Sequence, residues 1–84
     1  MNQPSLPDVR TREEFMEDHA SGAINIPLDQ LVKRMEEIRL FPKPVIVYCR
    51  SGNRSAAAIQ ILKEHGIDKI VNGRGLIDIK IKYK

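Results

Sequence analysis

The sequence predicts a small α/β domain in which a mainly parallel central sheet is flanked by helices. Short apolar segments rich in β-branched residues alternate with segments whose apolar residues follow helical spacing. The clearest apolar segment is 44–48, which contains Val-Ile-Val-Tyr and ends at a loop of small and basic residues. Strands separated by helices favour parallel pairing, because a parallel neighbour needs a helical crossover. We therefore expect three layers, with the sheet between helices.

The first half of the chain should contain two helices and a short strand. Thr11 and Glu14 have capping-box spacing, which predicts a short helix through Asp18. Residues 23–26 predict a short strand. Five apolar residues at helical spacing then predict one amphipathic helix that ends before Pro42. These residues are Leu28, Leu31, Val32, Met35 and Ile38.

The second half should contain one longer helix and a last strand. An alanine-rich segment after the strand at 44–48 predicts a helix from about Ser55 to His65. Gly66 suits the left-handed backbone position that follows a helix. A strand is predicted over 69–71, and it leads into a glycine-rich turn at 72–75.

Both ends should contribute less to the fold, within one domain that spans 1–84. Residues 1–7 are expected to be poorly ordered. Pro7 cannot donate a hydrogen bond, so the strand at Asp8 should be frayed or lie at an edge of the sheet. Three lysines give residues 80–84 the character of a basic tail.

Composition excludes several classes of function. The chain of 84 residues has one Cys and two His, so it holds neither an internal disulfide nor a plausible metal set, and no cofactor is implied. No apolar run approaches the ~20 residues of a membrane span. The net charge of +3 is scattered outside the tail, and two Tyr, two Phe and no Trp make a poor platform for nucleic acid. We expect a cytoplasmic protein, or a periplasmic one if a signal segment has been removed.

The only cysteine, Cys49, lies where the strand at 44–48 passes into the next helix. Amides at a helix start are unpaired and the helix dipole is positive there, so a loop at this place can bind an anion. Arg50 and Arg54 flank the thiol and should lower its pKa further. Gly52 and Asn53 permit the positive φ values of a tight loop, and Ser51 and Ser55 add hydroxyl groups. Residues 49–55 are called the cysteine loop below.

Other interpretations of these residues remain open. A lone cysteine at a strand end is often a buried apolar group, although such a cysteine does not require the Arg-Ser-Gly-Asn-Arg that follows here. Arg54 at a helix start needs an anionic partner. Arg50 could face substrate or solvent. His19 is interpreted as a local hydrogen-bonding residue, since a thiolate held by amides needs no general base.

Four segments resemble motifs of the rhodanese-like sulfurtransferases, in the same order. Residues 8–15 resemble the Asp-Val-Arg motif and its acidic helix, and residues 19–28 resemble the His-x-x-Gly-Ala-x-Asn-Ile-Pro segment. Residues 49–54 resemble the six-residue loop that runs from the active cysteine to an arginine. Residues 72–76 resemble the closing glycine-rich turn. The resemblance implies a rhodanese-like fold, and we expect Asp8 and Arg10 to support the site as an ion pair or hydrogen-bonded set.

The resemblance also implies a thiosulfate sulfurtransferase that forms a persulfide on Cys49. The expected partners are a small anionic sulfur donor, a thiol or cyanide acceptor, and a sulfur-relay protein as a further candidate. A non-enzymatic relay or interaction module of the same fold is the alternative. A cysteine-dependent phosphatase or an arsenate reductase is disfavoured, because phosphatases have five residues between cysteine and arginine and this chain has four.

The chain departs from the family pattern at two further positions. Arg74 stands where the family commonly has glycine, and Ala20 stands where a larger aliphatic residue is usual. Neither residue is expected to touch the cysteine loop.

Overall fold

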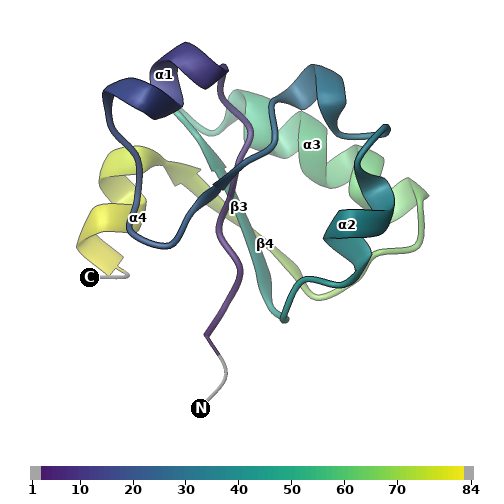
Figure 1. Cartoon of the computed structure of the whole chain (residues 1–84). Coiled ribbons are helices and arrows are strands. Elements are labelled where there is room, and N and C mark those ends of the chain that lie inside the picture. Colours follow the sequence, from purple (N-terminus) through teal and green to yellow (C-terminus); the bar gives the residue numbers. More distant parts are fainter. Residues whose placement is uncertain (1–2, 83–84) are drawn as a thin grey trace.

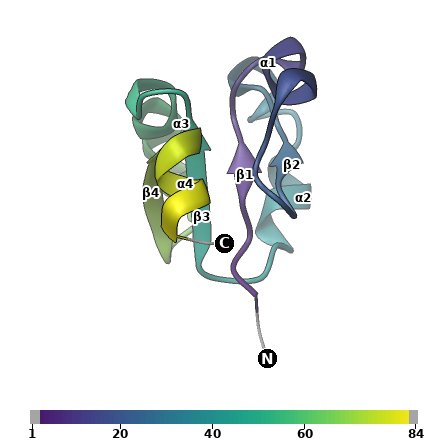
Figure 2. The same ribbon diagram turned by 90° about the vertical axis from the view of Figure 1, so that its left-hand side faces the viewer.

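Four parallel strands form one sheet in the computed structural model, which describes residues 3–82. The strands are β1 (Pro7–Asp8), β2 (Ile24–Asn25), β3 (Val45–Cys49) and β4 (Ile70–Gly75). Their order in the sheet is β2-β1-β3-β4, so the chain crosses over the sheet between consecutive strands. The carboxyl ends of β1 and β3 therefore lie at the same edge, the upper edge in Figures 1 and 2.

Helices cover both faces of this sheet. They are α1 (Arg12–Glu17), the short 3-10 helix η1 (Leu28–Gln30), α2 (Met35–Arg39), α3 (Asn53–Glu64) and α4 (Leu76–Lys82). In Figure 1, α2 and α3 lie on one side of β3 and α4 lies on the other, while α1 lies at the upper edge. The three-layer α/β architecture expected from the sequence is confirmed.

The alternation of β3 side chains explains its continuous apolar sequence. All five residues of β3 are buried. Val45, Val47 and Cys49 belong to the core cluster under α2 and α3. Ile46 and Tyr48 belong to the second cluster, which α4 covers through Ile79. A strand buried on both faces needs apolar residues at every position.

The N-terminal segment is more ordered than the sequence suggested. Pro7 belongs to β1, and β1 lies between β2 and β3 rather than at an edge. Leu6 is buried, and the amides of Ile24 and Ile46 donate to the carbonyl oxygens of Leu6 and Ser5, at 3.1 Å and 2.8 Å. The strand can contain Pro7 because these bonds use carbonyl acceptors that precede the proline and need no N–H from it. The expectation of an edge strand is wrong. Ser5, Leu6 and Pro7 take part in the sheet, whereas Met1 and Asn2 of the segment expected to be poorly ordered lie outside the described residues.

The amphipathic segment after β2 is not one helix. It divides into η1, a turn and α2. Leu31, Met35 and Ile38 are buried as the spacing predicted, but Val32 is 58% exposed. Packing in the core therefore determines which side chains of this segment are buried. The backbone forms the two short helices η1 and α2 instead of one continuous helix.

The C-terminal segment forms structure that the sequence analysis missed. β4 continues through Gly75, where a turn was expected, and α4 occupies Leu76–Lys82. Lys80 lies in this helix and forms an ion pair with Asp18, so residues 80–82 are not a tail. Residues 83 and 84 lie outside the described residues. α4 buries the second face of β3. The helix forms because of this packing, and its short sequence alone does not predict it.

Tyr48 provides a direct test of this second cluster. Its hydroxyl oxygen accepts a hydrogen bond of 3.1 Å from the backbone N–H of Ala20, and Tyr48 is fully buried. The Tyr48→Phe substitution leaves that amide without a partner, so we expect a loss of about 1–3 kcal/mol in the free energy of unfolding. Urea unfolding of both proteins measures it. Equal stability would show that water or a shifted backbone satisfies the Ala20 amide.

Candidate active site

Cys49 is the last residue of β3 and is 1% exposed. It is paired in register with Gly75 at the end of β4. The chain then turns sharply at Gly52, whose φ is 101°, and α3 begins at Asn53. The helix therefore starts two residues earlier than predicted, and of the two residues expected to permit a positive φ only Gly52 has one. This early start places Ser55, whose amide donates to the sulfur, in the first turn of α3.

Backbone donors converge on the sulfur of Cys49. The amide of Gly52 donates to Sγ at 3.0 Å and the amide of Ser55 at 3.3 Å. The hydroxyl oxygen of Ser55 lies 3.6 Å from Sγ. Burial raises the pKa of Cys49, but hydrogen bonds from the hydroxyl and amide of Ser55 and the amides of Gly52 and Ser51 outweigh burial and lower the pKa overall. Hydrogen bonds, rather than the flanking arginines expected from sequence, dominate the lowering.

Asn72 holds the hydroxyl of Ser55, and the sequence analysis gave Asn72 no role. The Ser55 hydroxyl lies 2.7 Å from Asn72 Oδ1 and 3.0 Å from the carbonyl oxygen of Gly52. The amide of Arg74 also donates to Asn72 Oδ1, at 2.8 Å. Because Ser55 has one hydroxyl proton, the hydroxyl must turn away from these acceptors when it donates to a Cys49 thiolate.

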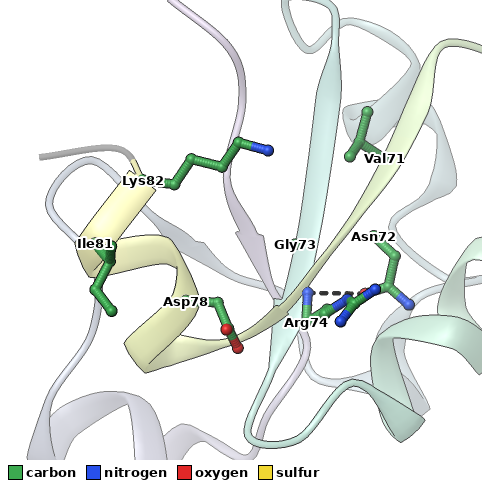
Figure 3. Close-up of a pocket in the computed structure, with 7 residues that line it drawn as sticks. All are labelled: Val71, Asn72, Gly73, Arg74, Asp78, Ile81 and Lys82. Carbon is green, nitrogen blue, oxygen red and sulfur yellow. Dashed lines mark hydrogen bonds between the residues drawn. The ribbon is translucent and has the colours of Figure 1, made fainter.

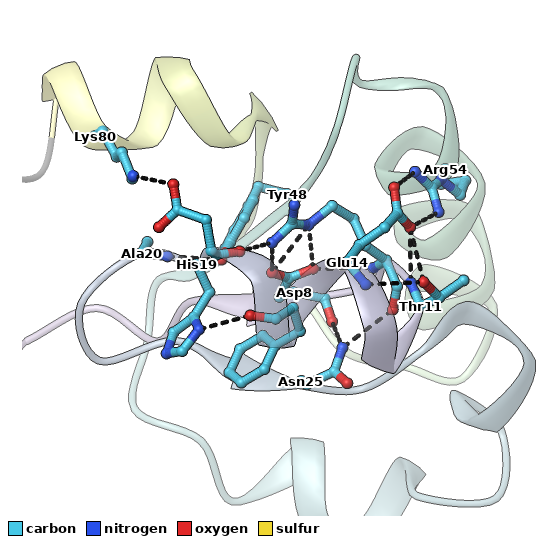
Figure 4. Close-up of polar contacts among 12 residues, drawn as sticks. Asp8, Thr11, Glu14, His19, Ala20, Asn25, Tyr48, Arg54 and Lys80 are labelled. Atoms are coloured by element: carbon cyan, nitrogen blue, oxygen red, sulfur yellow. Dashed lines mark hydrogen bonds and ion pairs between the residues drawn. The ribbon is translucent and has the colours of Figure 1, made fainter.

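Arg54 finds the anionic partner that its position requires, and the partner is Glu14 of α1. Two hydrogen bonds, at 2.7 Å and 2.9 Å, join the guanidinium to the two carboxylate oxygens (Figure 4). Glu14 also accepts the amide of Thr11, which completes the predicted capping box. The hydrogen bonds from Arg54 lower the pKa of Glu14 to about 2. Glu14 thus links α1 to the end of the cysteine loop. The two residues are far apart in the sequence, so no local pattern could predict their contact.

The predicted ion pair between Asp8 and Arg10 is present and buried. Arg10 Nη2 lies 2.7 Å from Asp8 Oδ2, and Arg10 Nε lies 3.0 Å from Asp8 Oδ1. Arg10 also donates to the carbonyl oxygen of Asp18 at 2.6 Å, which ties the end of α1 to β1. The side chain of Asn25 donates to the carbonyl oxygens of Asp8 and Arg10 (Figure 4). These residues shape the edge of the sheet without touching the sulfur.

The remaining residues of the loop face outward. Arg50, Ser51 and Asn53 are exposed. Arg50 lines a shallow pocket of about 300 Å³ together with Arg10 and Glu14. His19 Nδ1 lies 2.8 Å from the carbonyl oxygen of Phe15, which supports its interpretation as a local hydrogen-bonding residue.

The glycine-rich end of β4 packs directly against the cysteine loop. A side chain at Gly75 would collide with the carbonyl oxygen of Arg50. The Cα of Arg74 lies 3.6 Å from the place that a Cβ on Gly52 would occupy. The expectation that Arg74 stays clear of the loop is therefore wrong. Arg74 adopts a φ of 70°, which costs a residue other than glycine about 1–2 kcal/mol.

Neither a metal-binding cluster nor a membrane-spanning helix is found in the part of the chain that the structure describes. Within residues 3–82, no three His, Cys, Asp or Glu side chains gather in a way that could hold a metal ion. No helix in that range has the length and apolar character to cross a membrane.

Comparison with known proteins places the chain in a family. The model of the rhodanese-like domain matches residues 1–75. The chain is 38% identical over 73 residues to the thiosulfate sulfurtransferase PspE of Escherichia coli (strain K12), covering 86% of this chain and 70% of that protein. A solved structure of a rhodanese with anions from E. coli superimposes with a TM-score of 0.81 at 36% identity, covering 92% of each chain. The chain belongs to the rhodanese-like domain family.

A further relative differs in length. The chain is 47% identical over 70 residues to the uncharacterized protein YqhL of Bacillus subtilis (strain 168), covering 83% of this chain and 55% of that protein. It therefore spans about half the length of YqhL. The fold and the family agree with the sequence analysis, and relatives of this chain are named sulfurtransferases.

The lowered pKa of Cys49 predicts how the rate of its alkylation depends on pH. We expect the midpoint of iodoacetamide alkylation to lie below the ~8.5 of a free thiol. Ser55→Ala removes a hydroxyl donor and should raise the midpoint. Ser51→Ala, which keeps the backbone amide, is the matched control and should leave it unchanged. A parent midpoint at or above the free value, with the protein folded, would support an inert buried cysteine.

The Glu14–Arg54 pair predicts a loss of stability in acid. Pairing lowers the pKa of Glu14 from 4.5 to about 2, so its stabilising effect is complete above pH 4.5 and disappears as the pH falls toward 2. Arg54 is 35% exposed, and after allowance for screening we expect Glu14→Gln to cost about 1 kcal/mol at pH 7. Urea unfolding at pH 7, 4 and 2.5 measures the difference, which should shrink toward zero. A difference that stays constant with pH would mean that the charge of Glu14 does not matter.

Proposed function

We propose that this domain is a sulfurtransferase that carries sulfane sulfur as a persulfide on Cys49. The donor is thiosulfate or a similar anion, and the acceptor is cyanide or a thiol. One observation carries the proposal: the amides of Gly52 and Ser55 both point at Cys49 Sγ, at 3.0 Å and 3.3 Å. Such a sulfur is both ionised more readily and able to hold added negative charge. The similarity to a protein named thiosulfate sulfurtransferase supports the choice of donor.

The reaction consists of two displacements. The Cys49 thiolate attacks the outer sulfur of thiosulfate, a bond forms between the two sulfurs, and the original sulfur–sulfur bond breaks. Its electron pair leaves with sulfite, and the outer sulfur stays on Cys49 as an anionic persulfide. The carbon of cyanide then attacks that outer sulfur, releases thiocyanate and restores the thiolate. Charge is conserved in each step, and the kinetics are expected to be ping-pong.

The residues of the loop take distinct roles in this proposal. The amides of Ser51, Gly52 and Ser55 stabilise the thiolate and the persulfide, and the backbone turn at Gly52 directs them. Arg54 fixes the end of the loop through Glu14 rather than reaching for substrate. Arg50 lies at the exposed rim, where it can attract an anionic donor. The ion pair of Asp8 and Arg10 stabilises the edge of the sheet next to the loop.

The size of the loop disfavours phosphate chemistry. Four residues separate Cys49 from Arg54, and two of the intervening amides already lie close to the sulfur. A tetrahedral phosphoryl group needs a ring of donors wide enough to surround three oxygens. A loop directed at a single atom suits a terminal sulfur better.

A protein acceptor, as in a sulfur relay, is the second candidate. Ile77 of α4 is 74% exposed and lines the same shallow pocket as Arg50. An exposed apolar side chain beside a reactive loop is a feature that a protein partner could cover.

The proposal predicts that Cys49→Ser abolishes sulfur transfer. Oxygen replaces sulfur in a nearly isosteric side chain, so the fold should remain while the nucleophile is lost. Intact mass after incubation with thiosulfate should show one added sulfur atom on the parent and none on the variant, and thiocyanate should form with the parent alone.

Two outcomes would contradict the proposal. Sulfur uptake or turnover that persists in Cys49→Ser would exclude Cys49 as the carrier. A parent that hydrolyses aryl phosphates faster than it transfers sulfur would favour phosphatase chemistry instead.

A further inference from the structure

Arg74 lies against the cysteine loop. A Cβ placed on Gly52 would lie 3.6 Å from Arg74 Cα and 3.7 Å from its Cβ, so the start of the Arg74 side chain passes over Gly52. The amide of Gly52 is itself 3.0 Å from Cys49 Sγ. Arg74 is therefore separated from the sulfur by the backbone of one residue.

The turn does not need the arginine side chain. The amide of Arg74 donates to Asn72 Oδ1 at 2.8 Å, and a glycine would make the same bond. The φ of 70° is one that glycine adopts without steric cost. Among residues 3–82, no hydrogen bond of the Arg74 side chain offsets the strain. Arg74 keeps a strained backbone although its side chain makes no stabilising polar contact within the described part of the domain. Such a residue is a candidate for a functional role.

The charge of Arg74 is not neutralised by any ion pair among residues 3–82. Asp78 lines the same pocket, but its carboxylate accepts the amide of Gly75 at 3.0 Å. Figure 3 shows the guanidinium of Arg74 extending toward Asn72, away from that carboxylate. Arg54, in contrast, is held by Glu14. Arg74 thus adds an exposed positive charge beside the loop.

We infer that Arg74 is a specificity-determining residue that favours sulfur donors with two negative charges over donors with one. The inference rests on the proposed sulfur transfer at Cys49. A cation at the rim of a site attracts an approaching anion in proportion to its charge. Thiosulfate is a dianion, whereas an aryl thiosulfonate delivers the same type of sulfur as a monoanion. Arg74 should therefore assist thiosulfate more strongly.

The first experiment compares the two donors in the parent and in Arg74→Gly. We expect kcat/KM for thiosulfate to fall about three- to tenfold, mainly through a higher KM. The fall for benzenethiosulfonate should be smaller, near the square root of that factor. Arg74→Lys should restore most of the preference, and added salt should reduce the difference between parent and Arg74→Gly.

Lys69 offers a matched control. It is also an exposed cation with a positive φ, 56°, but it precedes β4 at the end of the strand far from Cys49. Lys69→Gly removes the same charge and the same type of strain. We expect it to leave both kcat/KM values unchanged. Both glycine variants should melt at or above the temperature of the parent, because glycine relieves the backbone strain. An equal effect of Lys69→Gly and Arg74→Gly would overturn the inference, because net charge alone would then explain the loss.

A second experiment is independent of sulfur transfer. Iodoacetate is an anion and iodoacetamide is neutral, and both alkylate Cys49. The ratio of the iodoacetate rate to the iodoacetamide rate should fall about two- to fivefold in Arg74→Gly. It should remain at the parent value in Lys69→Gly. An unchanged ratio, or equal losses for both sulfur donors, would overturn the role of Arg74. A parent that takes no sulfur from either donor would instead overturn the proposed function.

Discussion

Arg10 donates to both carboxylate oxygens of Asp8 and to the carbonyl oxygen of Asp18, and this buried group connects the end of β1 to the end of α1. The rest of the site depends on that connection. Once α1 is fixed at the carboxyl edge of the sheet, Glu14 can hold Arg54 at the start of α3. A buried pair of this kind tolerates change poorly, because removing one partner leaves an uncompensated charge that typically costs about 3–5 kcal/mol.

The elements that the sequence predicted well are those specified by neighbouring residues. The capping box of Thr11 and Glu14 is local, and so is the change from an apolar strand to a small and basic loop at Cys49. The elements that were missed depend on packing. The segment after β2 divides because the core selects Leu31, Met35 and Ile38 without requiring a continuous helix. α4 forms over the second face of β3, and a seven-residue helix gains little from its own sequence.

The same distinction applies to the candidate site. Cys49, Gly52 and Ser55 are close in sequence, so the loop that holds the sulfur could be predicted as a unit. The contacts that hold the loop in place come from distant segments. Asn72 reaches Ser55 from β4, and Glu14 reaches Arg54 from α1. A single sequence has no pattern that marks such pairs, although the demand of Arg54 for an anionic partner was evident from its place at a helix start.

The depth of Cys49 also limits the covalent bonds that its sulfur can form. A disulfide requires two sulfurs about 2.05 Å apart, with defined dihedral geometry at both. Cys49 is 1% exposed and is the only cysteine in the sequence. Two copies of the domain, each with its sulfur behind the loop, cannot approach to that distance in the described conformation. The fold therefore protects a readily ionised thiol from oxidative dimerisation.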